Sequence, residues 1–166
     1  MTLVLQVDPS TLSTAQQKGE RVVCGHIQHF IKPKVQKSQD ALYNAILTEW
    51  KKEGGKTTVV KVKKGNKLVY REVCVSPFDP KEPVILGCGF AFPFTSNTPK
   101  KKRVSGKVMM VERPDLDNLI KGTQDALVHA GILPDDSQVA WYCNIYKYRS
   151  ERPCVIIQLM SAKELG

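Results

Sequence analysis

Apolar and polar residues alternate near the N-terminus and predict a short strand over Leu3 to Val7. Pro9 ends this strand, and the small, polar stretch from Ser10 to Glu20 is a candidate mobile segment. The apolar residues within Arg21 to Ile31 predict a second extended segment. The chain is therefore expected to begin with extended structure.

The first helix is predicted between Ser38 and Lys52, where apolar residues recur every three or four positions. Ser38 is a residue type that caps helix N-termini, and Gly54-Gly55 follows the expected end. The apolar residues that set this spacing are Leu42, Ala45, Ile46 and Trp50.

Lys56 to Val75 has the pattern of a β-hairpin that turns at Lys64-Gly65-Asn66-Lys67, and we interpret it as an insertion. Its lysines fit contact with DNA, and they fit the solvated face of an edge ribbon equally well. Ser76 to Pro83 contains three prolines and is expected to be a linker within the domain.

Val84 to Phe94 is apolar enough for a central strand, and Val104 to Val111 is expected to be its antiparallel partner. The connection from Thr95 to Arg103 ends in four consecutive cations, Lys100, Lys101, Lys102 and Arg103. Cations in a row repel one another and are best tolerated beside an anion. Phosphate contact and a mobile, solvated loop tip both fit this run.

A second helix is predicted after Arg113-Pro114, with Asp117 or Asn118 as its cap and Gly131 just beyond its end. Its apolar face contains Leu119, Thr123, Ala126, Leu127 and Ala130. Its polar face contains Asn118, Lys121, Asp125 and His129.

Two strands are expected to complete the fold, Val139 to Tyr148 and Cys154 to Met160, with Asp135-Asp136-Ser137 as a loop before them. Trp141, Tyr142, Tyr146 and Tyr148 fit base stacking or, more commonly, packing within a sheet. At 166 residues the chain is long enough for one well-buried core, and a single domain is expected.

The chain is strongly basic, with 25 Lys and Arg against 16 Asp and Glu, a net charge of +9. Nucleic acid, an anionic membrane surface or an acidic protein is the expected kind of partner, although solubility alone also selects charge. The sequence contains no apolar run of the roughly 20 residues that a membrane span needs, and its N-terminus lacks the pattern of a signal peptide. We therefore expect a cytoplasmic protein.

The five cysteines form an odd set without a Cys-x-x-Cys pair. This argues against a disulfide framework or a zinc ribbon, and we expect reduced, mostly buried thiols. Cys24, His26 and His29 have the chemistry of soft-metal ligands, but they lack a second pair, and chance spacing explains them better.

The sequence concentrates acidic residues in Asp115-Leu-Asp117-Asn118, followed by Lys121 one helical turn later and by Asp135-Asp136 after the helix. Carboxylates gathered without histidine or thiolate are ligands for Mg²⁺ or Mn²⁺. In a basic protein, such a site suits phosphodiester hydrolysis, with Lys121 stabilising the extra negative charge of the transition state. A second interpretation is that Asp117 only caps the helix and Asp135-Asp136 only makes a turn.

The pattern from Arg113 to Tyr148 closely resembles the core signature of the RusA family of Holliday-junction resolvases. The matching residues are Asp115-Leu-Asp117-Asn118-Leu-x-Lys121, Asp125-Ala-Leu, Gly131-Ile-Leu and Asp135-Asp136-Ser-Gln-Val139. The resemblance implies an α+β fold, with a mixed β-sheet packed by two main helices in a single domain. It also implies a small, homodimeric endodeoxyribonuclease that depends on Mg²⁺ and acts on four-way junction DNA.

The same resemblance assigns roles to individual positions. It implies Asp115, Asp117 and Asp136 as metal-binding carboxylates, Lys121 as an essential lysine, and Asn118, Asp125 and Asp135 as supporting residues. We expect Lys100 to Arg103 and Arg113 to contact DNA. The resemblance weakens toward the N-terminus.

These observations lead to the hypothesis of one RusA-like endonuclease domain over residues 1–166, which resolves Holliday junctions with Mg²⁺ or Mn²⁺. Two other hypotheses stay open. One is a branched-DNA-binding protein with impaired catalysis, and the other is a less selective nuclease on flap or branched DNA.

Overall fold

The computed structural model describes residues 1–12, 18–23, 26–31 and 33–165. Its strands are β1 (Thr2–Leu5), β2 (Lys18–Val23), β3 (His26–Ile31), β4 (Thr57–Lys64), β5 (Lys67–Cys74), β6 (Val84–Pro93), β7 (Val108–Met109), β8 (Val139–Ser150) and β9 (Cys154–Ser161). Its α-helices are α1 (Pro33–Lys52), α2 (Lys100–Arg103) and α3 (Leu116–Ala130). Three 3₁₀ turns complete it, η1 (Pro9–Thr11), η2 (Asp136–Gln138) and η3 (Ala162–Leu165).

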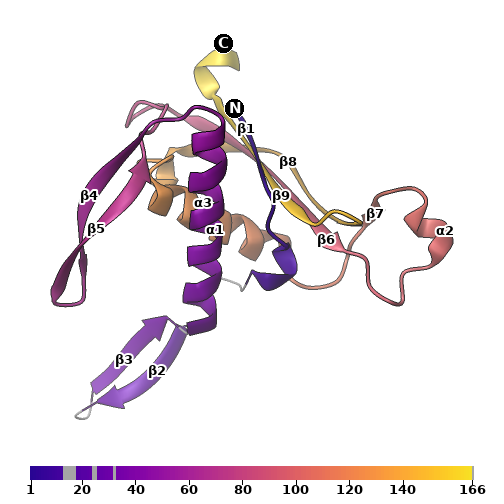
Figure 1. Ribbon diagram of the computed structural model, residues 1–166, viewed down its shortest axis with the longest axis horizontal. Helices are drawn as coiled ribbons and strands as arrows, with labels where there is room; N and C mark the ends of the chain where they lie inside the picture. The colour runs from indigo at the N-terminus through magenta and orange to yellow at the C-terminus, as the bar shows by residue number, and fades with distance from the viewer. Residues whose placement is uncertain (13–17, 24–25, 32, 166) are drawn as a thin grey trace.

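The main sheet has five strands in the order β1-β9-β6-β8-β7 (Figure 1). β6 is the central strand, and it pairs with β8 in parallel and with β9 antiparallel. The sheet is therefore mixed, and α1 and α3 are the two long helices. This confirms the predicted α+β class.

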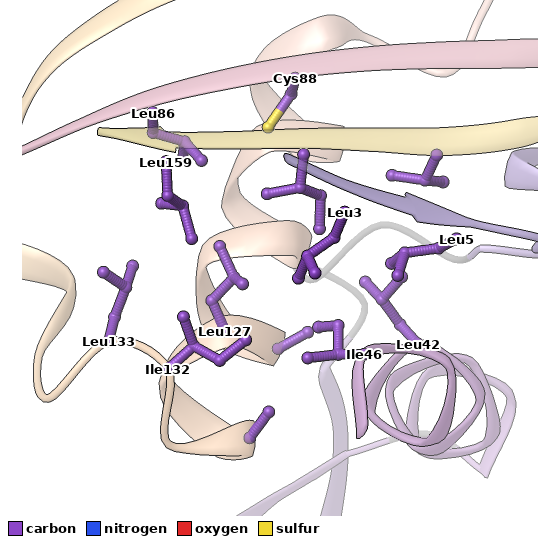
Figure 2. Packing of buried hydrophobic residues seen from close by; sticks show 14 of the residues in the cluster. Leu3, Leu5, Leu42, Ile46, Leu86, Cys88, Leu127, Ile132, Leu133 and Leu159 are labelled. Carbon is purple, nitrogen blue, oxygen red and sulfur yellow. The ribbon is translucent and has the colours of Figure 1, made fainter. Parts of the chain in front are cut away.

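Parallel strands need a long crossover connection, and α3 lies in the crossover between β6 and β8. Figure 2 shows how α1 and α3 cover one face of the sheet, where Leu42, Ile46 and Leu127 meet Leu3 and Leu159. Burying each such side chain stabilises the fold by about 1.5–3 kcal/mol. The crossover thus holds α3, with its acidic N-terminal end, firmly against the sheet.

The described N-terminal part corrects two predictions. Instead of one extended segment from Arg21 to Ile31, β2 and β3 pair antiparallel, and β2 already begins at Lys18. Residues 13–17 of the candidate mobile segment lie outside the described residues. The helix α1 begins at Pro33 rather than at Ser38, because proline suits the first turn of a helix, and Ser38 is buried within it.

The segment after β6 was also predicted wrongly. Only Val108–Met109 forms a strand, and it pairs with β8 at the edge of the sheet, because β8 and β9 already occupy both sides of β6. Lys100–Arg103, expected in a loop, forms the single helical turn α2. Its last residue, Arg103, donates to Thr98 O at 3.0 Å and to Thr95 O at 2.8 Å, which fixes this connection.

The hairpin of β4 and β5 is confirmed, with Lys64 opposite Lys67 at its turn. It forms a sheet of its own, and its turn lies apart from the five-stranded sheet in Figure 1. At its other end, Glu72 pairs with Lys51 of α1 at 2.8 Å, and Tyr43 donates a hydrogen bond to the carbonyl of Glu72. Lys61 and Lys63 are exposed, and neither interpretation of these lysines is decided.

The four described cysteines are free thiols, as expected. Burial raises the pKa of Cys88 to about 12 and that of Cys74 to about 11, so both stay protonated at neutral pH. Cys24 lies outside the described residues, and its pattern with two histidines is therefore untested. In the described part of the chain, no helix is long and apolar enough to cross a membrane.

Candidate active site

α3 supplies most of the candidate site. Its buried residues are the five that the sequence predicted: Leu119, Thr123, Ala126, Leu127 and Ala130. The cap, however, is Asp115 rather than Asp117 or Asn118, and the side chain of Asp115 makes no capping hydrogen bond. Asp117 stands in the first turn, where the helix dipole favours a negative charge. Neither aspartate therefore uses its carboxylate as a side-chain cap.

A lysine of β8 holds the chain just before this helix. Lys147 Nζ donates to the carbonyls of Glu112 and Pro114, at 2.8 Å each. Arg149, two residues further along β8, pairs with the carboxylate of Glu112 at 3.5 Å. Sequence reasoning missed Lys147, because a lysine that binds backbone carbonyls leaves no residue pattern. Its position next to Asp115 makes it a positioning residue for the candidate site.

The two adjacent aspartates after α3 have different roles. Asp135 accepts a hydrogen bond from Ser137 N at 2.9 Å and caps η2, and its hydrogen bonds with Ser137 hold the pKa of Asp135 below the usual range. Gln138 is buried and donates to Asp79 O at 2.7 Å, which anchors the same turn from its other end. Asp136 forms no ion pair among the described residues and is exposed. The interpretation that these aspartates only make a turn thus applies to Asp135, while the carboxylate of Asp136 is free to bind a ligand.

An open cavity of about 510 Å³ brings together three of the four predicted catalytic residues. Asp117 and Lys121 line it from α3, and Asp136 lines it from η2. Asp115 is exposed and is not among the lining residues. The other polar side chains around the cavity are Asn118, Gln124, Ser137 and Tyr142.

A second open cavity, of about 390 Å³, shares Asp136 with the first. Asp125, Asp135, His129 and Arg71 also line it. Burial raises the pKa of Asp125, the charge of Asp136 raises it further, and Lys121 opposes the shift. The carboxylates of Asp125 and Asp136 are therefore close enough to repel each other along the polar side of α3.

The donors in the first cavity fit a hard divalent cation. Asp117 and Asp136 supply carboxylate oxygens, and the buried Oδ1 of Asn118 has no hydrogen-bond partner. Among the described residues, no three Asp, Glu, His or Cys side chains gather closely enough to hold one ion. Mg²⁺, however, is usually held by one or two carboxylates together with waters and substrate phosphates. Two carboxylates that line one cavity are sufficient for that arrangement.

The aromatic residues of β8 divide between packing and exposure. Tyr148 is buried, and a side chain at Gly89 would meet the ring of Tyr146 at 2.8 Å, so both rings pack on the sheet as expected. Tyr142 is 47% exposed and donates to Gln124 Oε1 at 3.0 Å beside the first cavity. Trp141 is also exposed.

The cations expected to contact DNA do not line either cavity. Lys100 to Lys102 are exposed on α2, which lies on the opposite side of the molecule from the β4–β5 hairpin in Figure 1. Arg103 is occupied by backbone carbonyls, and its guanidinium lies 5.6 Å from the ring centre of Phe94. Arg113 is exposed before α3. Contact of these residues with DNA stays a prediction.

Comparison with known families identifies the chain. A family model described as endodeoxyribonuclease RusA matches residues 48–160, which is more than half of the chain and includes both cavities. The chain belongs to the RusA endodeoxyribonuclease family. The RusA match begins inside α1, in agreement with a resemblance that weakens toward the N-terminus.

One relative of this RusA-family chain is the uncharacterized protein YqaN of Bacillus subtilis (strain 168), which is 41% identical over 66 residues. The similarity covers 39% of this chain and 45% of YqaN. The chain thus matches less than half of the length of this relative.

Proposed function

We propose that this RusA-family protein is an endodeoxyribonuclease that uses Mg²⁺ or Mn²⁺ and resolves Holliday junctions. One observation carries the proposal: Asp117 and Asp136, from two separate segments, line the same cavity as Lys121 in a chain with a net charge of +9. A basic protein that leaves carboxylates without ion pairs is suited to bind a cation and a polyanion together.

In this proposal Asp117 and Asp136 hold the metal ion, with the amide oxygen of Asn118 beside them and Asp115 at the edge of the site. The ion, when bound, supplies Lewis acidity and lowers the pKa of a water molecule that attacks phosphorus. Lys121 places its ammonium group where negative charge accumulates on the phosphate oxygens. Lys147 keeps Asp115 and the start of α3 in position through the two carbonyls that it binds.

The junction substrate and the homodimer are parts of the same proposal. A four-way junction has approximate two-fold symmetry, and its resolution needs matched cuts in two strands. A symmetric dimer places two equal sites for these cuts. The basic surface binds the phosphate backbone without reading the base sequence, so affinity falls as salt rises.

A nicking assay tests the proposal. The wild-type protein is incubated with a synthetic four-way junction, a flap and a linear duplex, each with Mg²⁺ or with a chelator. We expect paired cuts in the junction, with Mg²⁺ only. Equal cutting of flap and junction would instead show a less selective nuclease, and junction binding without any cutting would show an impaired binding protein.

The variant Asp117→Asn links the activity to the site. It removes a metal ligand and a negative charge together, so we expect cleavage to be lost while junction binding is unchanged or tighter. Cleavage at the wild-type rate by this variant would rule out the proposed site.

A further inference from the structure

Arg71 is a cation that the sequence did not single out and that the proposed cleavage chemistry does not use. It lies on β5, at the end of the hairpin that packs against α3. Its Nη1 lies 2.9 Å from Nδ1 and 2.6 Å from Nε2 of His129 on α3. Its guanidinium also lies 5.7 Å from the ring centre of Tyr43 on α1, and the rings of Tyr43 and His129 meet edge to face. Three elements therefore fix the position of this arginine.

The guanidinium of Arg71 has no carboxylate in direct contact within the part of the chain that the structure describes. Within the described residues it forms no ion pair, although Asp125, Asp135 and Asp136 line the same cavity. A donor such as Arg71 requires an unprotonated nitrogen of His129, so this neighbour is neutral when the contact forms. Burial lowers the pKa of His129, and the charge of Arg71 lowers it further. The Nε of Arg71 is buried without a hydrogen-bond partner.

The location of Arg71 relates it to the candidate site. Asp136 lines the cavity of Arg71 and also the cavity of Asp117 and Lys121, so the two cavities adjoin. Along α3, Lys121 and His129 are eight residues apart, which corresponds to about 12 Å. A duplex strand advances about 3.4 Å per nucleotide along its axis, so this distance spans three to four nucleotides.

We propose that Arg71 binds a backbone phosphate of the substrate, three or four nucleotides from the phosphate that is cut. This inference rests on the proposed function and adds a subsite to it. A planar guanidinium held in place by aromatic neighbours is suited to bind two phosphate oxygens at once. The open cavity beside it admits such a ligand, and the hairpin end would thereby set the course of one DNA strand along α3.

A purely structural role is the competing explanation, since Arg71 also joins the hairpin to α3. Two variants break the same contact from opposite sides and separate these roles. Arg71→Ala removes the contact and the charge, while His129→Ala removes the contact and leaves the charge. Arg152→Ala is the matched control, because it removes one exposed arginine from the turn between β8 and β9.

The experiment measures binding of the full-length protein to a four-way junction in metal-free buffer over a series of salt concentrations. Each phosphate contact in duplex DNA contributes about 0.9 to the slope of log affinity against log salt. We expect Arg71→Ala to reduce the slope by about 0.9, and we expect His129→Ala and Arg152→Ala to leave it unchanged. Equal changes for Arg71→Ala and His129→Ala, or an unchanged slope for Arg71→Ala, would overturn the proposal.

Neutral methylphosphonate linkages locate the contact. Each junction carries one such linkage at a different position along the strand. The affinity of the wild type should fall most when the linkage lies three or four nucleotides from the cut, and the affinity of Arg71→Ala should not change for that junction. A response of Arg71→Ala equal to that of the wild type would contradict the subsite. The salt series requires no cleavage, so it tests phosphate binding by Arg71 even if the nicking assay fails.

Discussion

The two halves of α3 have the same amphipathic pattern but different surroundings. In the N-terminal half, Asp117 and Lys121 are exposed beside an open cavity, and neither forms an ion pair among the described residues. In the C-terminal half, His129 contacts Arg71 and Tyr43, and Gly131 ends the helix with a positive φ of 82°. One half therefore leaves Asp117 and Lys121 without an ion pair among the described residues, and the other uses its polar side chain to attach neighbouring elements.

This difference explains why helical periodicity alone does not locate a functional site. The polar side of α3 includes both Lys121 and His129, and both are typical of a solvated helix surface. What distinguishes them is whether the rest of the fold supplies a partner.

The largest expected effect comes from the adjacent aspartates after α3. Asp136→Asn removes a carboxylate that lines the same cavity as Asp117, so we expect the cleavage rate to fall by at least about 100-fold, more than the loss of an outer-shell partner causes. Asp135→Asn is the matched change, and it keeps the cap of η2 because asparagine also caps helices. We expect this variant to cut at nearly the wild-type rate in the same nicking assay. Equal losses in both variants would contradict the division of roles.

A core substitution in the C-terminal half should act on stability instead. Leu127 is fully buried between α3 and the sheet, and Leu127→Ala should lower the free energy of unfolding by about 2–5 kcal/mol. Chemical denaturation measures this change. The folded fraction should still cut junctions, because Leu127 contacts neither cavity. A loss of activity in fully folded protein would show that the two halves are not independent.

Lys121→Ala should lower the cleavage rate and leave stability unchanged, the opposite of Leu127→Ala. We expect the rate at saturating DNA to fall by about 10- to 100-fold, since the ammonium group stabilises the transition state more than the bound substrate. The free energy of unfolding should stay within about 0.5 kcal/mol of the wild type, because the side chain is exposed. Rate measurements over a range of DNA concentrations distinguish this outcome from a simple loss of affinity.

The sequence predicted most of what depends on local pattern. The buried face of α3, its end at Gly131, the β4–β5 hairpin and the central strand β6 all follow from periodicity and turn residues. Strand pairing did not follow, because Val104 to Val111 has a strand-like composition, but both sides of β6 are taken by other strands. Long-range pairing depends on the whole topology, which a local window does not contain.

The candidate site was predictable to a similar extent. The spacing of Asp115, Asp117 and Lys121, with Asp135-Asp136 after the helix, drew attention to the two ends of α3, and the family resemblance assigned roles to these residues. Local pattern does not separate Asp135 from Asp136, since both are exposed aspartates in one turn, and only the family resemblance distinguished them. Lys147 was missed for a related reason, because its partners are carbonyl groups that every residue carries. Contacts of this kind become visible only in three dimensions.

The smallest predicted effect concerns the pH dependence of the C-terminal contact. The groups around His129 are Arg71 on β5 and Asp40 and Tyr43 on α1, and of these Asp40 alone raises the pKa of His129, against the lowering by burial and by Arg71. The native state therefore binds a proton less readily than the unfolded chain. The contribution of neutral His129 to the free energy of unfolding is fully present above the ordinary histidine pKa of about 6.5. It decreases as the pH falls through this value toward the lower pKa of the folded state.

Because the ring is partly exposed, solvent screens the effect, and we expect a loss of only a few tenths of a kcal/mol between about pH 7 and pH 5. Denaturant unfolding of the wild type and of His129→Gln over this range measures the difference. Glutamine offers a neutral acceptor to Arg71 at every pH, so the variant should lose this part of the pH dependence. If the pH profile of His129→Gln is identical to that of the wild type, Arg71 and His129 do not interact strongly enough to hold the hairpin against α3. The contrast between the two halves of the helix would then depend on Tyr43 and the buried core alone.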